Sequence, residues 1–169
     1  EDDGEKVIAD ILEFDPDIVF NNAYYPGIQN RILDRLYNEW SDTDKVIMNT
    51  GSISGYLGPI IGDEPDYVKD KRALAEYCIL NSFNYKVNNS CRIQCISFGF
   101  IDTPLLNLSK EDNTPNMISV NDAAFLMVDT AFKEQPFLVP EMVINPIQHD
   151  DVMLKYYKIA TKNMLKHVA

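Results

Sequence analysis

Short apolar runs alternate with helix-like segments along this chain, and the alternation constrains its fold more than any other feature. Each run places apolar residues on consecutive positions, which is typical of strands that are buried on both faces. Strands separated by helices predict βαβ units, and therefore an α/β fold: a Rossmann-like parallel sheet with helices on both faces. The strand-like runs are 17–20, 45–48, 92–97 and 142–144.

The segments between the runs carry apolar residues at helical spacing, except where glycine and proline interrupt them. A polar loop is expected at 49–55, and irregular backbone at 56–65, which contains glycine and proline. A terminal helix is expected at 150–169, and the whole chain, 1–169, is read as a single domain. Further helices are predicted at 7–12, 28–40, 67–87 and 120–132.

The composition is that of a globular protein, with 46% hydrophobic and 24% charged residues. The net charge of −11 opposes nonspecific binding to nucleic acid or to anionic membranes. No apolar stretch is long enough to span a bilayer and no signal peptide is found, so we expect a cytoplasmic location. Cys78, Cys91 and Cys95 lack the spacing of a metal site and are expected to be buried thiols.

Tyr67 and Lys71 stand four residues apart in a helix-like run, so their side chains are expected on one face. A positive charge beside a phenol favours the phenolate, which lowers the pKa of Tyr67 from about 10 toward neutrality. Such a tyrosine can pass a proton to or from a substrate oxygen. Because this spacing also occurs by chance on surface helices, the neighbouring strand ends decide how it is interpreted.

Small polar segments follow three of the strand-like runs, at the strand ends where ligands bind in parallel sheets. Asn21, Asn22 and Ala23 follow the first run, and Ser52 follows the second. The sequence Gly-Phe-Ile-Asp-Thr, 99–103, follows the third run, after the Tyr67 helix. The four motifs therefore occur in a fixed order from one strand end to the next.

This order of motifs resembles the short-chain dehydrogenase/reductase family in its compact form, over residues 17–146. The resemblance implies an NAD(P)-dependent oxidoreductase that interconverts an alcohol and a carbonyl by hydride transfer. It makes Tyr67 the general acid or base, and Ser52 the hydrogen-bond partner of the substrate oxygen. Lys71 would lower the pKa of Tyr67 and hold the nicotinamide ribose. NAD and NADP are not distinguished, and neither is the small-molecule substrate.

The resemblance also implies the residues that would hold the cofactor, and a homo-oligomer. Asn21 and Ala23 would line the cofactor cleft. Gly99 would let the backbone approach the cofactor closely, because glycine lacks a Cβ. The Ile101 backbone and the Thr103 hydroxyl would bind the nicotinamide carboxamide.

Three of these assignments have alternatives. Ser54 has the more usual spacing to the tyrosine, whereas Ser52 aligns with the second serine of the family's Asn-x-Ser-Ser pattern. The Asn21 and Asn22 side chains could simply tie two loops together. The Thr103 hydroxyl is also typical of an ordinary turn.

The chain departs from the family pattern at several positions. Tyr24 replaces the glycine of Asn-Asn-Ala-Gly, Phe98 replaces a proline, and Gly51 replaces the first serine. The stretch 23–45 is short and lacks the asparagine of the family's proton relay, a role that we do not assign to Asn30. These departures favour a second interpretation, a non-catalytic dinucleotide-binding or scaffold protein with the same fold.

The largest departure is the lack of a glycine-rich Gly-x-x-x-Gly-x-Gly turn before residue 17. The chain is therefore expected to hold only the C-terminal portion of the fold, with the N-terminal strands absent. Asp2 or Asp3 would correspond by spacing to the acid that caps the adenine. Strand 17–20 would then form an apolar open edge that invites pairing. We expect the chain to be part of a longer protein or to be completed by another polypeptide.

Overall fold

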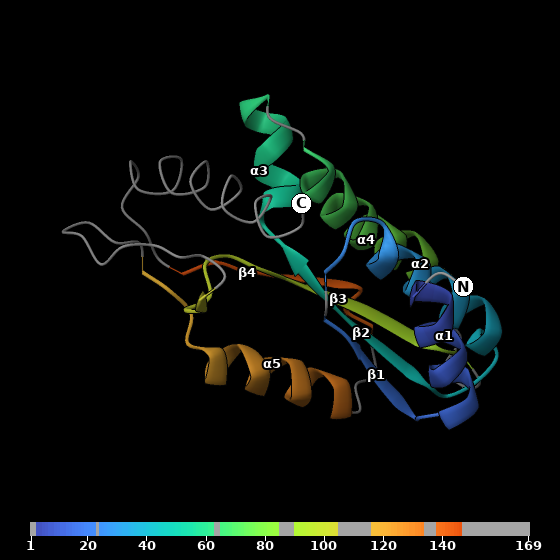
Figure 1. Cartoon of the computed structure of the whole chain (residues 1–169). Coiled ribbons are helices and arrows are strands. Elements are labelled where there is room, and N and C mark those ends of the chain that lie inside the picture. The colour runs from blue at the N-terminus through green and yellow to red at the C-terminus, as the bar shows by residue number, and fades with distance from the viewer. Residues whose placement is uncertain are drawn as a thin grey trace.

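The computed structural model describes residues 3–22, 24–62, 65–84, 90–104, 116–133 and 138–146. Ala23, Asp2, the loop around 105–115 and the expected terminal helix at 150–169 lie outside these ranges. Within them, helices and strands alternate as predicted (Figure 1). The elements are α1 Asp3–Phe14, β1 Ile18–Asn21, α2 Ile28–Trp40, β2 Val46–Ser52, α3 Ser54–Ile61, α4 Asp66–Ser82, β3 Arg92–Phe98, α5 Val120–Phe132 and β4 Glu141–Ile144.

The four strands form one parallel sheet in the order β1-β2-β3-β4. Helices α1, α2 and α4 cover one face and α5 covers the other (Figure 1). Successive residues of β2 therefore point into different cores: Ile47 packs with Leu33 and Leu74, and Met48 packs with Met127 of α5. This confirms the predicted α/β fold with a parallel sheet and helices on both faces.

The prediction of irregular backbone at 56–65 is wrong for 56–61, because α3 occupies Ser54–Ile61. Gly55 does not break the structure: a Cβ at this position would meet the backbone N of Arg72 at 2.9 Å. The glycine instead allows α3 to pack closely against α4. The helix ends at Gly62, whose φ of 71° is the left-handed conformation typical of a glycine at this position.

The prediction of a polar loop at 49–55 is also wrong in its first half, because β2 continues through Ser52. Gly51 lies within the strand, where a Cβ would meet Cys95 Sγ at 2.6 Å and would also contact Ser97 Oγ. The polar Asn49 is fully buried, but its side chain bonds to backbone and side-chain partners. A satisfied amide does not end a strand, so the polarity of this segment was a misleading signal.

Strand β1 lies at the edge of the sheet, as expected from the sequence. It pairs with β2 and with no other strand among the described residues. The Phe20 side chain on this strand is 41% exposed. None of the helices in the described ranges is long and apolar enough to cross a membrane.

Candidate active site

Tyr67 and Lys71 lie in the first two turns of α4. The helix begins after Pro65, which has an extended backbone (ψ 164°). The Val68 and Lys69 N–H groups donate hydrogen bonds to the Pro65 carbonyl oxygen. Tyr67 and Lys71 are 7% and 4% exposed. The Lys71 Nζ lies 5.7 Å from the centroid of the Tyr67 ring, which confirms that the two side chains share a face.

The Lys71 ammonium is held by two uncharged acceptors. Its Nζ donates to Gln29 Oε1 and to the Thr50 carbonyl oxygen, both at 2.7 Å. Burial lowers the pKa of Lys71 to about 8, because the charged form loses its hydration. Cys95 and Asp70 act in the opposite direction. The lysine therefore titrates much closer to neutral pH than an exposed lysine does.

The Tyr24 side chain packs against this pair. Its ring meets the Tyr67 ring edge-on, with centroids 4.9 Å apart, and lies 5.4 Å from Lys71 Nζ. Its hydroxyl donates to Asp70 Oδ2 at 3.2 Å. Burial, followed by the Asp70 charge and hydrogen bond, raises the pKa of Tyr24. Tyr24 is therefore a neutral, anchored ring that covers part of the Tyr67–Lys71 pair.

Ser52 and Ser54 are both buried and are bonded to each other. Ser52 Oγ donates to Ser54 Oγ at 3.0 Å and accepts from the Ser54 backbone N–H at 3.2 Å. Ser52 ends β2 and Ser54 begins α3, so both lie at the carboxyl end of the sheet. The choice between the two as the catalytic serine stays open. A serine does not fit at Gly51, because a Cβ at this position would collide with side chains of β3.

The Asn21 side chain forms internal bonds of the kind that the loop-tying alternative requires. Its Nδ2 donates to the Gln29 carbonyl oxygen at 2.9 Å and to Asn49 Oδ1 at 2.8 Å. These bonds join the end of β1 to α2 and to β2. The assignment of Asn21 to the cofactor cleft stays a prediction.

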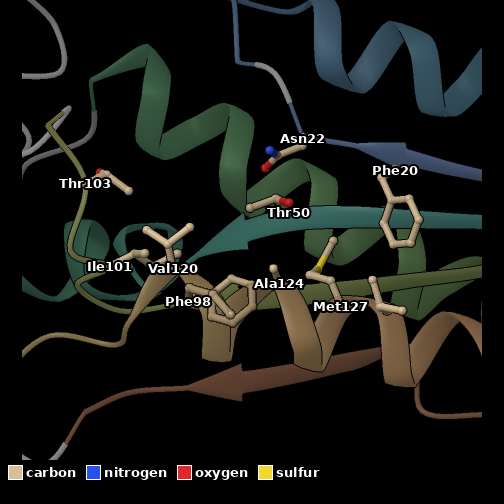
Figure 2. A pocket seen from close by; sticks show the side chains of 11 residues that line it. Phe20, Asn22, Thr50, Phe98, Ile101, Thr103, Val120, Ala124 and Met127 are labelled. Atoms are coloured by element: carbon tan, nitrogen blue, oxygen red, sulfur yellow. The ribbon is translucent and has the colours of Figure 1, made fainter.

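A pocket of about 350 Å³ lies between the strand ends and α5 (Figure 2). It contains two of the predicted cofactor residues, Ile101 and Thr103, and its walls are mainly apolar. Asn22, Thr50 and Thr103 supply polar side chains. The pocket is lined by Phe20, Asn22, Thr50, Phe98, Ile101, Thr103, Val120, Ala123, Ala124, Met127 and Val128.

Gly99 is required here by packing between strands. A Cβ on Gly99 would meet Pro146 Cδ at 2.8 Å and would also contact Asn145 Oδ1. The segment after β4 therefore fills the space beside this glycine. Close approach of a cofactor to Gly99 stays a prediction, as does the role of Ala23, which lies outside the described residues.

Gln29 is the residue of the site that the sequence reasoning missed. It lies in the first turn of α2, is 2% exposed, and is bonded to Lys71. The available signal was that the Gln29 amide falls on the apolar face of a helix that follows a strand end, which indicates a buried polar side chain. Asn30, its neighbour, donates to the Asp70 carbonyl oxygen at 3.0 Å instead.

No family model matches the sequence, and neither does any curated protein. Several solved structures share the fold. A short-chain dehydrogenase/reductase (glucose/ribitol dehydrogenase) from Brucella melitensis has a TM-score of 0.58 and 17% identity, over 86% of this chain and 68% of that chain. The NADH-dependent reductase A1-R′ responsible for alginate metabolism has a TM-score of 0.51 and 15% identity, over 85% of this chain and 69% of that chain.

An apo SCOR enzyme from Clostridium thermocellum has a TM-score of 0.52 and 16% identity, over 88% of this chain and 71% of that chain. Similarity to solved structures at such low sequence identity shows a common fold, while the roles of individual residues have to be argued from their geometry. The parallel order of β1 to β4 agrees with that likeness. The chain therefore has the fold of the short-chain dehydrogenases/reductases.

Proposed function

We propose that this chain carries the proton-transfer half of an NAD(P)-dependent oxidoreductase that interconverts an alcohol and a carbonyl by hydride transfer. The observation that carries the proposal is the buried Lys71 ammonium 5.7 Å from the Tyr67 ring, at the end of a parallel sheet where ligands bind. The similar structures include a dehydrogenase and an NADH-dependent reductase, which supports this reaction class.

Each side chain then has a defined task. In reduction, Tyr67 donates its phenolic proton to the carbonyl oxygen as the carbonyl carbon receives a hydride, and in oxidation it accepts the proton from the alcohol. The positive charge of Lys71 stabilises the resulting phenolate. Ser52, or Ser54 in its place, orients the substrate oxygen with its hydroxyl. A bound nicotinamide would supply or accept the hydride.

The pocket beside α5 fits the nicotinamide end of such a cofactor. Its mainly apolar walls suit a flat ring, and Thr103 can hydrogen-bond a carboxamide, next to the Ile101 backbone. The Lys71 ammonium has two of its three N–H groups bonded to Gln29 and Thr50, which leaves one for a ribose hydroxyl or for the phenol. The residues do not distinguish NAD from NADP.

Substitution of Tyr67 by phenylalanine tests the proposal. Tyr67→Phe should lower the turnover number at least ~100-fold, because it removes the proton donor. Its affinity for NADH or NADPH, followed by cofactor fluorescence, should change little. Tyr77→Phe is the matched control, since it also removes a tyrosine hydroxyl from α4. That hydroxyl donates to Asp34 and is not part of the proposed site. Unchanged turnover in Tyr67→Phe would remove Tyr67 from the mechanism.

The cover that Tyr24 provides favours a second candidate, a non-catalytic dinucleotide-binding or scaffold protein. The Tyr24 ring packs against Tyr67 and lies near Lys71, so a ligand reaches their polar atoms only if that ring moves. Fluorescence titration with NADH and NADPH separates the candidates. Binding without turnover on a panel of small alcohols and carbonyls would favour a dinucleotide-binding protein, and no binding would favour a scaffold.

We further propose that another strand completes the sheet beside β1, supplied by the same polypeptide or by another chain, including a second copy. The strand offers an unpaired edge within the described residues, and its Phe20 is both exposed and part of the pocket lining. Native mass spectrometry tests this, since a soluble 19.3 kDa monomer that unfolds cooperatively would contradict it.

A cytoplasmic location stays a prediction. The three cysteines are buried and free, as expected from the sequence.

A further inference from the structure

Gln29 connects Lys71 to two strands of the sheet. Its Oε1 accepts from Lys71 Nζ at 2.7 Å. Its Nε2 donates to the Asn21 carbonyl oxygen at 2.6 Å and to the Thr50 carbonyl oxygen at 3.1 Å. The amide is thus hydrogen-bonded to the end of β1, to β2 and to the lysine of α4. All three bonds form at a side chain that is almost fully buried.

This network leaves one possible orientation for the Gln29 amide. The Nε2 donates to two carbonyl oxygens that can only accept, so the Oε1 must face Lys71. The backbone is held as well, because Asn21 Nδ2 donates to the Gln29 carbonyl oxygen at 2.9 Å. The acceptor for Lys71 is therefore fixed before any ligand binds.

The acceptors that touch Lys71 carry no net charge. Tyr67 and Asp70 face it from α4, Tyr24 from the segment after β1, and Cys95 from β3. The one carboxylate among them, Asp70, is bonded to the Tyr24 hydroxyl and to the Gly27 N–H, and not to the ammonium. Burial lowers the pKa of Lys71 to about 8, and the opposing effects of Cys95 and Asp70 offset only part of that loss.

We propose that Gln29 is a positioning residue: its amide oxygen holds the Lys71 amine beside Tyr67 and gives it a neutral hydrogen-bond partner in place of an ion pair. A carboxylate at the same place would keep the lysine charged. A residue without an acceptor would leave the ammonium with fewer bonds in the same buried setting. The consequence for proton transfer rests on the function proposed above, whereas the effect on Lys71 does not.

The test is an NMR titration of Lys71 in the folded protein with ¹³C-labelled lysine, assigned by the signal lost in Lys71→Arg. Gln29→Met should lower the pKa of Lys71 by more than about 0.3 unit, because it removes an acceptor from the ammonium. Gln94→Met is the matched control, because Gln94 is an equally buried glutamine whose Nε2 bonds to the Val139 carbonyl oxygen. That control should leave the pKa of Lys71 unchanged.

Two results would overturn the inference. One is a pKa of Lys71 that agrees within about 0.3 unit in the wild type and in Gln29→Met, since loss of the acceptor has to disfavour the ammonium. The other is an equal shift in Gln29→Met and Gln94→Met. If Gln29→Met does not fold, Gln29→Leu takes its place in the same comparison. The titration needs neither cofactor nor turnover, so it can fail while the oxidoreductase proposal survives, and the reverse also holds.

Discussion

The buried Lys71 makes the stability of this fold depend on pH in a direction that can be measured. Burial lowers the pKa of Lys71 from 10.5 to about 8. Between these two values the folded protein holds the neutral amine while the unfolded chain binds the proton. The free energy of unfolding therefore gains a contribution that rises with pH across this window. Below pH 8 the cost of burying the charge is fully present, and above pH 10.5 it is gone.

The size of the effect follows from the same two values. A difference of one pKa unit corresponds to about 1.4 kcal/mol, so the full window is worth about 3 kcal/mol, and the part from pH 8 to 9.5 about 2 kcal/mol. Both Lys71 hydrogen bonds survive deprotonation, because a neutral amine still has two N–H groups for Gln29 and Thr50. The amine form is therefore fully accommodated in the folded structure.

Urea unfolding of the wild type and of Lys71→Met, at several pH values from 7 to 9.5, measures this contribution. Other titrating groups affect both proteins alike, so they cancel in the difference between the two free energies of unfolding. Wild type minus Lys71→Met should rise by about 2 kcal/mol from pH 8 to 9.5. Lys69→Met, which removes an exposed lysine from the same helix, controls for the loss of one positive charge. A difference that stays flat or falls with pH would refute the argument.

Three further predictions concern the residues around this lysine. Ser52→Ala should lower the turnover number ~100-fold while Ser54→Ala lowers it less, in steady-state kinetics; the reverse order would move the substrate-orienting role to Ser54. Tyr24→Gly should tighten NADH binding in a fluorescence titration, because it uncovers Lys71, and weaker binding would argue that the ring is part of the site. Gly51→Ser should cost about 1–3 kcal/mol in urea unfolding, since its Cβ would meet Cys95 Sγ at 2.6 Å, and an unchanged midpoint would contradict that crowding.

Patterns that depend on local sequence predicted the fold well. The apolar runs at 17–20, 45–48, 92–97 and 142–144 each overlap a strand. The signal is clearest for β2 and β3, because a strand buried on both faces needs apolar side chains at successive positions. The shared face of Tyr67 and Lys71 followed from helix geometry alone. The open edge at β1 was expected from the family resemblance instead, because the family's sheet has a further strand beside this one.

Features set by contacts distant in the sequence could not be predicted. Gly55 was assigned to a polar loop and Pro59 to irregular backbone, although α3 contains both, because the close approach of Gly55 to Arg72 exists only in the folded structure. Gln29 acquires its role from Asn21, Thr50 and Lys71, which come from three different elements. A single glutamine in a helix gives no local indication of such partners.

The contact at Gly55 explains how this chain tolerates an unusual distance in sequence between its serine and its tyrosine. Between these two residues, α3 packs against α4, with Gly55 against the backbone of Arg72. The placement of α3 relative to the start of α4 is thus governed by how closely the two helices pack, and not by the number of residues that connect them.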